Sequence, residues 1–261
     1  MELIGFVLLG LISGFFAGLL GLGGGIITVP VMAMVALPYL NFSAHEVMHV
    51  AVASSLVAMI PTAFMSAFGH YRQQGIIWSI ALKFSPGLII GGVLGALLAS
   101  SVASQSLQFA FATFLIFVSM YMLSSPVDML KPAHTKAKIN PAVSLPIAFI
   151  SASLGVGGGT MTVPYLQWRG VELRKAIGIS AYCGLPIGIA SSLTFYAMQS
   201  SDLPVSTGQF IYFPAVLGII IGSMISAPFG AKCTHHLPVK LIKRLFSIVL
   251  LLASAKLFMI W

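Results

Sequence analysis

Long apolar stretches alternate with short polar connections along the whole chain. Residues 76–103 contain one charged side chain, Lys83, and residues 107–123 contain none. A helix of about 20 apolar residues spans the hydrocarbon core of a bilayer, because each residue adds about 1.5 Å along the helix axis. No polar stretch is long enough to form a separate soluble domain. The pattern therefore predicts an all-α polytopic membrane protein.

One glycine-rich segment within these apolar stretches occurs twice. Residues 21–30 read GLGGGIITVP, and residues 155–164, which lie 134 positions later, read GVGGGTMTVP. A helix that opens at membrane depth leaves amides and carbonyls unpaired, which is tolerated only inside protein or beside a water-filled cavity. Two such segments at matching positions of the two halves indicate a paired binding site of a transporter.

The similarity between the halves extends beyond this segment. Each half continues with a polar connection that contains an acidic residue, a helix with mid-span hydroxyls, a helix with small residues at four-residue spacing, and a last apolar helix. The small residues allow helix backbones to approach closely. We expect a first membrane repeat over residues 1–126, a cytoplasmic linker over 127–140 and a second membrane repeat over 141–261. The matching positions are Glu46 and Glu172, His49 and Lys175, the pair Ser54 and Ser55 with Ser180, the set Gly91, Gly95 and Ala99 with Gly218, Gly222 and Ser226, and the helices 107–123 and 241–258.

Positive charges are confined to a few connections. Of the 13 Lys and Arg residues, 11 fall in four connections, at position 72 and within 131–138, 169–175 and 232–244. The other connections carry none. Because Lys and Arg favour the cytoplasmic side, these four connections should share the cytoplasmic face. The four connections share one face if each glycine segment is the tip of a hairpin that enters and leaves the membrane by the same face. They do not share one face if each glycine segment crosses the membrane straight through.

The lengths of the arms agree with hairpins. Residues 141–154 form about 21 Å of helix, short of a full span, whereas residues 2–20 are long enough to cross. Each half then contains one hairpin and three crossings, and since three is odd the halves have opposite orientations. The sequence predicts two inverted repeats, each a Gly-rich broken or re-entrant helical hairpin plus three transmembrane helices. We expect a multi-pass protein of the cell (inner) membrane with both termini periplasmic.

The two glycine tips are expected to meet near the middle of the membrane and to bind an anion. Glycine lets a ligand approach the backbone closely, and a helix N-terminus offers free N–H groups and the positive end of its dipole. Tight helix crossing is the alternative interpretation, but crossing motifs space their glycines rather than placing them consecutively. The predicted substrate-binding residues are Gly23, Gly24, Gly25, Thr28, Ser54, Ser55, Gly157, Gly158, Gly159, Thr160, Thr162 and Ser180.

Other polar residues have structural alternatives. A serine hydroxyl can bond to a carbonyl of its own helix. Arg72 is a candidate for gating at the cytoplasmic mouth, although a lone loop arginine fits a topology determinant better. His49 is a candidate for gating or proton coupling. The alternative interpretation is a histidine at a helix end whose hydrogen bonds are satisfied within the protein. The residues Cys183 and Cys233 lack metal-ligand spacing, so we expect no metal site.

Several function classes are disfavoured. The net charge of +8 is explained by membrane orientation rather than by nucleic acid. Carboxylates are absent from the predicted crossings, which disfavours cation transport, although carbonyl and hydroxyl oxygens still suffice for one Na⁺. Neither glycine segment matches a nucleotide-binding motif, so no cofactor is expected. No G-x-S-x-G elbow occurs, which argues against a serine hydrolase and against an enzyme generally.

The motifs resemble the TauE/SafE sulfite-exporter family, also called the toluene-sulfonate uptake permease family. The resemblance rests on the duplicated glycine segment ending in proline, on HYRQQG at 70–75 before a Gly-rich helix, and on KRLF at 243–246. It implies transport of sulfur-containing anions such as sulfite or sulfonates. After Gly75 the chain has Ile76, Ile77 and Trp78, where many members carry a polar or acidic residue before the aromatic one.

We therefore expect a secondary transporter of small sulfur-containing anions that works by alternating access around a central glycine-lined site. A gradient of Na⁺ or H⁺ is the expected driving force, because no nucleotide-binding motif is present. A passive anion channel or facilitator is the alternative. The expected partners are the anion, the lipid bilayer and the coupling ion, with the chain acting as a monomer or homodimer.

Overall fold

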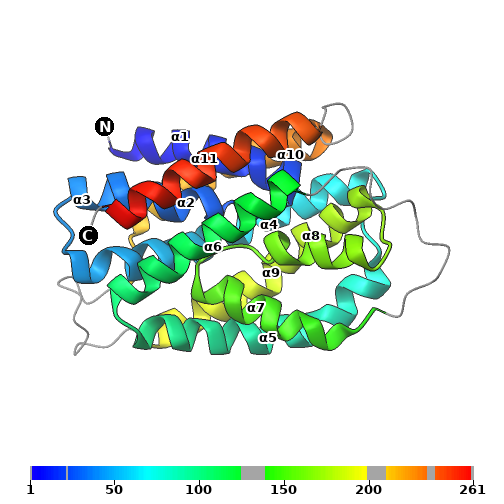
Figure 1. The fold of residues 1–261 in the computed structure, drawn as a ribbon, viewed down its shortest axis with the longest axis horizontal. Helices are drawn as coiled ribbons and strands as arrows, with labels where there is room; N and C mark the ends of the chain where they lie inside the picture. The colour runs from blue at the N-terminus through cyan, green and yellow to red at the C-terminus, as the bar shows by residue number, and fades with distance from the viewer. Residues whose placement is uncertain (1, 22, 125–138, 199–209, 234–238, 260–261) are drawn as a thin grey trace.

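The computed structural model describes residues 2–21, 23–124, 139–198, 210–233 and 239–259, and all regular secondary structure within them is helical (Figure 1). The expectation of an all-helical protein is therefore confirmed for these residues. Six of the described helices are long and apolar enough to cross a bilayer: α1 (Glu2–Leu20), α4 (Ala44–Arg72), α5 (Trp78–Ser101), α6 (Ser104–Ser124), α9 (Leu173–Ala197) and α10 (Phe213–Cys233). The last helix is α11 (Val239–Met259).

Each glycine segment separates two helices of a hairpin. In the first half, α1 is followed by α2 (Gly25–Val31), a π-helical stretch (Met32–Ala36) and α3 (Leu37–Tyr39). In the second half, a 3₁₀ turn (Pro141–Val143) and α7 (Ser144–Ser153) are followed by α8 (Gly159–Trp168). In Figure 1, α2 and α3 lead back to the end of the molecule where α1 begins. Both glycine segments thus interrupt a helix, as the sequence predicts.

The prolines that close the two segments have different effects. Pro30 lies in α2, and a π-helical stretch starts two residues later. By contrast, α8 continues without interruption past Pro164 to Trp168. A proline inside a helix often limits how far the helix continues. In α8 the missing proline N–H removes one backbone hydrogen bond without ending the helix.

The small residues at four-residue spacing allow helices from the two halves to pack closely. A side chain at Gly91 or Gly95 of α5 would overlap the carbonyls of Leu145 or Phe149 on α7. Likewise, Gly222 of α10 lies against the carbonyl of Val7 on α1. The predicted close approach is therefore confirmed, and it joins α5 to α7 and α10 to α1.

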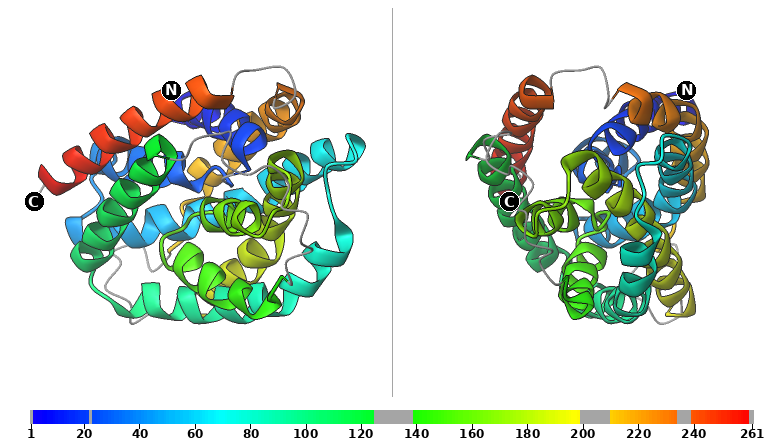
Figure 2. Two further views of the ribbon diagram at one scale, coloured as in Figure 1. Left: turned by 45° about the vertical axis from the view of Figure 1, so that its right-hand side comes forward. Right: turned by 90° about the vertical axis from the view of Figure 1, so that its right-hand side faces the viewer.

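The contacts also give the relative directions of the helices. Residue numbers rise together along α1 and α10, where Gly10, Gly14 and Gly18 face Ile219, Ser223 and Ala227, so these helices are parallel. Residue numbers run in opposite directions along α4 and α9, where Gly184 and Gly188 face Ala63 and Ile60, so these two helices are antiparallel. They also run oppositely along α6 and α11, since Gln108 bonds to Leu257 and Ser119 to Ser247. Figure 2 shows α6 and α11 side by side at one flank.

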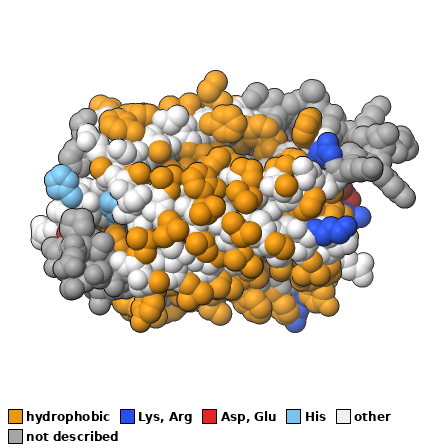
Figure 3. All heavy atoms as spheres, turned by 90° about the horizontal axis from the view of Figure 1, so that it is seen from below, with side chains coloured by type: hydrophobic (Ala, Val, Ile, Leu, Met, Phe, Trp, Pro, Cys, Tyr) orange, Lys and Arg blue, Asp and Glu red, His pale blue; other side chains and the backbone are white. Residues whose placement is uncertain are grey.

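The surface has an apolar band between two polar ends (Figure 3). Several helices expose large apolar side chains, including Ile90 of α5, Phe117 of α6, and Leu217 and Phe229 of α10. In the view of Figure 3 the Lys and Arg side chains gather at one end and histidines at the other. An apolar belt of this size is what a lipid-facing surface requires.

Candidate functional site

The two glycine tips touch each other inside the molecule. A Cβ atom at Gly23 would overlap the backbone of Gly157, and one at Gly25 would overlap the carbonyl of Gly155. Both segments are buried among the helices rather than exposed to lipid. The structure therefore brings the two tips together, as expected from the sequence. It also gives glycine a packing role at this contact, because no larger residue fits there.

The backbone at the tips has a conformation that favours glycine. Gly21 and Gly155, which occupy equivalent positions in the two motifs, have φ angles of 68° and 67°. Gly23 and Gly24 have φ angles of 78° and 75°. L-residues with a Cβ adopt this left-handed region at an energetic cost, which glycine avoids. The two motifs thus share a left-handed residue at their first glycine, whereas Gly157 and Gly158 do not have the positive φ of Gly23 and Gly24.

Two serines connect the halves through reciprocal hydrogen bonds. The Ser55 hydroxyl of α4 donates to the carbonyl of Gly155 at 2.9 Å. The Ser180 hydroxyl of α9 lies 3.1 Å from the carbonyl of Gly21 and 2.8 Å from that of Ile177 in its own helix. Each half therefore contributes a buried serine that contacts the first glycine of the other half's tip. We call this pair of contacts the serine brace.

Two further predicted hydroxyls also bond to the backbone. The Ser54 oxygen accepts a hydrogen bond from the N–H of Tyr212 at 2.9 Å. The Thr28 hydroxyl donates to the carbonyl of Gly24 at 3.2 Å, within its own hairpin. These serines and the threonine stabilise the protein in this conformation, and their contact with a substrate stays a prediction.

The second tip differs from the first at its hydroxyls. Thr160 is only 6% exposed, and its hydroxyl has no hydrogen-bond partner among the described residues. The equivalent residue of the first motif is the apolar Ile26. Thr162 is fully buried, and its hydroxyl, which lies beside the thiol of Cys183, also has no hydrogen-bond partner among the described residues, but Thr162 does not line the cleft that leads to Thr160. An unpaired buried hydroxyl is costly, which makes Thr160 the clearest candidate ligand group of the tips.

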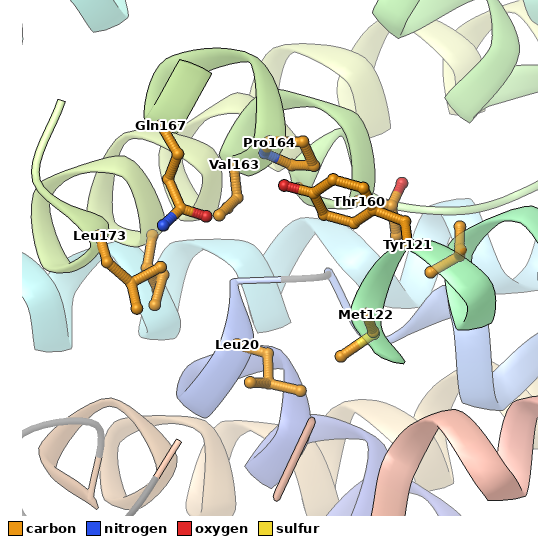
Figure 4. A pocket seen from close by; sticks show the side chains of 11 residues that line it. Leu20, Tyr121, Met122, Thr160, Val163, Pro164, Gln167 and Leu173 are labelled. Atoms are coloured by element: carbon orange, nitrogen blue, oxygen red, sulfur yellow. The ribbon is translucent and has the colours of Figure 1, made fainter. Parts of the chain in front are cut away.

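A cleft leads to Thr160 (Figure 4). Its walls come from the C-terminal part of α6, from α8, from the start of α9 and from the end of α1. The space in it for a water-sized molecule is about 30 Å³. The lining residues are Leu20, Val118, Tyr121, Met122, Gly159, Thr160, Val163, Pro164, Gln167, Leu173 and Ile177.

Sequence reasoning did not single out two polar residues of this cleft. Gln167 follows Thr160 by seven positions on α8, which is the spacing of residues on one helix face. The sequence alone could therefore have indicated that Gln167 lies on the same face as Thr160. Tyr121 lies on α6 in the other half, and nothing in the sequence pattern connects it with the tip. Their convergence depends on how α6 packs against the second hairpin.

The structure does not bring the two gating candidates to the tips. Arg72 is the last residue of α4, and its guanidinium lies 4.6 Å from the centre of the Phe68 ring. His49 is buried near the start of α4, with Nε2 2.9 Å from the carbonyl of Val102 and Nδ1 3.3 Å from that of His45. Their roles in gating stay predictions. Among the described residues, no cluster of His, Cys, Asp and Glu side chains could hold a metal ion.

Known proteins match this chain over almost its full length. A family model described as sulfite exporter TauE/SafE matches residues 6–257. A probable membrane transporter protein of Haemophilus influenzae is 29% identical over 259 residues, which cover 97% of this chain and 97% of that protein. The probable membrane transporter protein YunE of Bacillus subtilis is 24% identical, covering 98% of this chain and 97% of the relative. One from Methanocaldococcus jannaschii is 23% identical, covering 94% and 91%. No solved structure matches significantly.

Proposed function

Because the chain belongs to the sulfite exporter TauE/SafE family of membrane transporters, we propose that it carries small sulfur-containing anions across the cell membrane as a secondary transporter. The substrate binds where the two glycine tips meet. Access to this site alternates between the two membrane faces. Transport uses an ion gradient of Na⁺ or H⁺.

The observation that carries this proposal is the contact of the two tips beside the open N-terminus of α8. This helix begins at Gly159, and the unpaired hydroxyl of Thr160 lies in its first turn. Free N–H groups and the positive end of the helix dipole favour an anion. A sulfite or sulfonate group accepts several hydrogen bonds through its oxygens, which suits donors of this kind.

The distribution of carboxylates agrees with an anionic substrate. The acidic residues of the described chain are Glu2, Glu46 and Glu172, and each lies at the start of a helix rather than at mid-span. Glu46 is buried, but it lies in the first turn of α4, where the helix dipole stabilises a negative charge. Cation carriers generally place carboxylates at membrane depth, so an anion suits the described spans better.

An inverted relation of the two halves explains several packing features together. In this arrangement α4 corresponds to α9 and α6 to α11, and each pair is antiparallel. The contact of α1 with α10 has its counterpart in the contact of α7 with α5. The serine brace is likewise reciprocal. We infer that the two halves are inverted repeats which rock against each other, with the Lys- and Arg-bearing end in the cytoplasm and both termini in the periplasm.

Counterflow in liposomes tests the proposed function. The purified protein is reconstituted with unlabelled sulfite inside, and the uptake of labelled sulfite is measured against a panel of sulfonates, thiosulfate, sulfate and chloride. A carrier gives transient, saturable accumulation that sulfur anions compete away. Conductance carried equally by chloride, without counterflow, would identify a passive channel instead. The close approach of the Gly23 and Gly157 backbones favours the carrier, because the tips would have to separate before an anion could pass between them.

A further inference from the structure

The cleft beside the second tip has a polar end and apolar walls. Its lining includes Thr160, whose hydroxyl is buried, and the start of α8, a helix of 10 residues. Leu20, Val118, Met122, Val163, Leu173 and Ile177 supply aliphatic walls. The amide of Gln167 and the side chain of Tyr121 are the further polar groups in its lining. Figure 4 shows Gln167 and Thr160 on α8, with Tyr121 approaching from α6.

None of the described side chains that line this cleft is charged. Burial of an ion without a counter-charge is costly, and the cost grows with the square of the ionic charge in the Born description. A singly charged anion therefore enters this cleft far more easily than a doubly charged one. The helix N-terminus and a few neutral donors can compensate a single charge, and the aliphatic walls accommodate an apolar group.

On the basis of the proposed transport function, we propose that this cleft is the substrate route from the Lys- and Arg-bearing end to the second tip, and that Gln167 and Tyr121 determine specificity there. The route selects singly charged anions that carry a small apolar group, such as short alkanesulfonates, over dianions such as sulfate. Sulfite itself enters as the singly protonated anion.

The cleft as observed is a narrowed form of this route. Its space of about 30 Å³ accommodates only a few water-sized molecules. Leu20 belongs to the first hairpin, whereas the other walls belong to α6, α8 and α9. Movement of the first hairpin away from α8 therefore widens the cleft. This links the opening of the route to the separation of the two tips.

The test introduces a positive charge into the cleft. Gln167→Lys should let sulfate compete with labelled methanesulfonate in counterflow, at a half-inhibitory concentration about tenfold lower than in the wild type. Trp168→Lys is the matched control: it adds the same charge one residue away, at a side chain that is 72% exposed and does not line the cleft. Sulfate competition should not change in this control.

Further variants keep the inference falsifiable if Gln167→Lys does not fold. Gln167→Glu should weaken competition by all anions, and Thr160→Val should raise the half-saturating methanesulfonate concentration severalfold. Thr113→Val is the control for the latter, because its exposed hydroxyl bonds to its own helix. Unchanged specificity in the folded Gln167 variants, or equal effects in Trp168→Lys, would overturn the inference. Absence of counterflow by the wild type with any sulfur anion would instead contradict the proposed function.

Discussion

The serine brace predicts how easily the two tips separate. Ser55 and Ser180 are buried, and each contacts a carbonyl of the opposite tip at about 3 Å. One side-chain hydrogen bond between membrane helices contributes about 1 kcal/mol. Ser55→Ala should therefore raise the population of the separated state about fivefold, because 1.4 kcal/mol corresponds to a factor of ten. The Ser55→Ala/Ser180→Ala double variant should raise it further, by less than another factor of about five, because the Ser180 hydroxyl has one proton and its carbonyl acceptors include the nearer Ile177 of its own helix.

The assay measures how often the cleft opens. A single cysteine replaces Leu20, which is 4% exposed, in a background where Cys183 and Cys233 are alanine. The rate at which a small thiol reagent modifies it reports the population of the separated state. The rate should rise about fivefold in Ser55→Ala, in line with the free-energy estimate above.

A matched control separates the brace from general stability. The buried Ser119 hydroxyl donates to the carbonyl of Ser247 at 2.8 Å, joining α6 to α11 away from the tips. Ser119→Ala should lower thermal stability by a similar amount and leave the modification rate unchanged. The reasoning is refuted if Ser55→Ala and Ser180→Ala leave that rate unchanged, or if Ser119→Ala raises it equally.

Three other predictions concern the tips and the topology. Gly24→Val should abolish counterflow in a folded protein, because a β-branched residue at its φ of 75° costs about 1–3 kcal/mol. Gly158→Val should do the same because its side chain would fill space at the second tip, where the nearest atom to the new Cβ is the movable Cδ1 of Ile187 at 2.8 Å. Normal counterflow in both would exclude a role for the tips. Arg72 and Gln105 are exposed at opposite ends of the helices, so cysteines at these two positions should react with impermeant reagents from opposite faces of the membrane. Modification of both cysteines from the same face would disprove the topology. His49→Phe removes the hydrogen bond to the carbonyl of Val102 and should slow anion counterflow. If counterflow in this variant depends on pH as it does in the wild type, His49 has no role in proton coupling.

The glycine pattern was sufficient to predict the backbone features of the fold. Consecutive glycines without side chains indicate a break in a buried helix, and the structure has such breaks at 21 and 23–24 and at 154–158. Small residues at four-residue spacing, such as Gly91 and Gly95, predicted close helix packing, and they contact α7 directly. These features follow from local backbone sterics, so a single sequence contains them.

The partners of the side chains could not be predicted in the same way. Ser55 bonds to a carbonyl 100 positions away, and Ser180 to one 159 positions away. Tyr121 reaches the second tip because α6 packs beside that hairpin. Such pairings depend on how the two halves pack together. The residue pattern of a single sequence does not give the register of that packing. The predicted linker at 127–140 lies outside the described residues except for Ile139 and Asn140.

Accessibility of the second tip from both membrane faces tests the central claim most directly. A cysteine replaces Thr160 in the cysteine-free background, and an impermeant thiol reagent is applied to one face of oriented membranes at a time. Alternating access predicts modification from either face, with sulfite or methanesulfonate protecting the cysteine and changing the ratio of the two rates. Modification from one face only, at a rate that no sulfur anion changes, would contradict alternating access at the glycine tips.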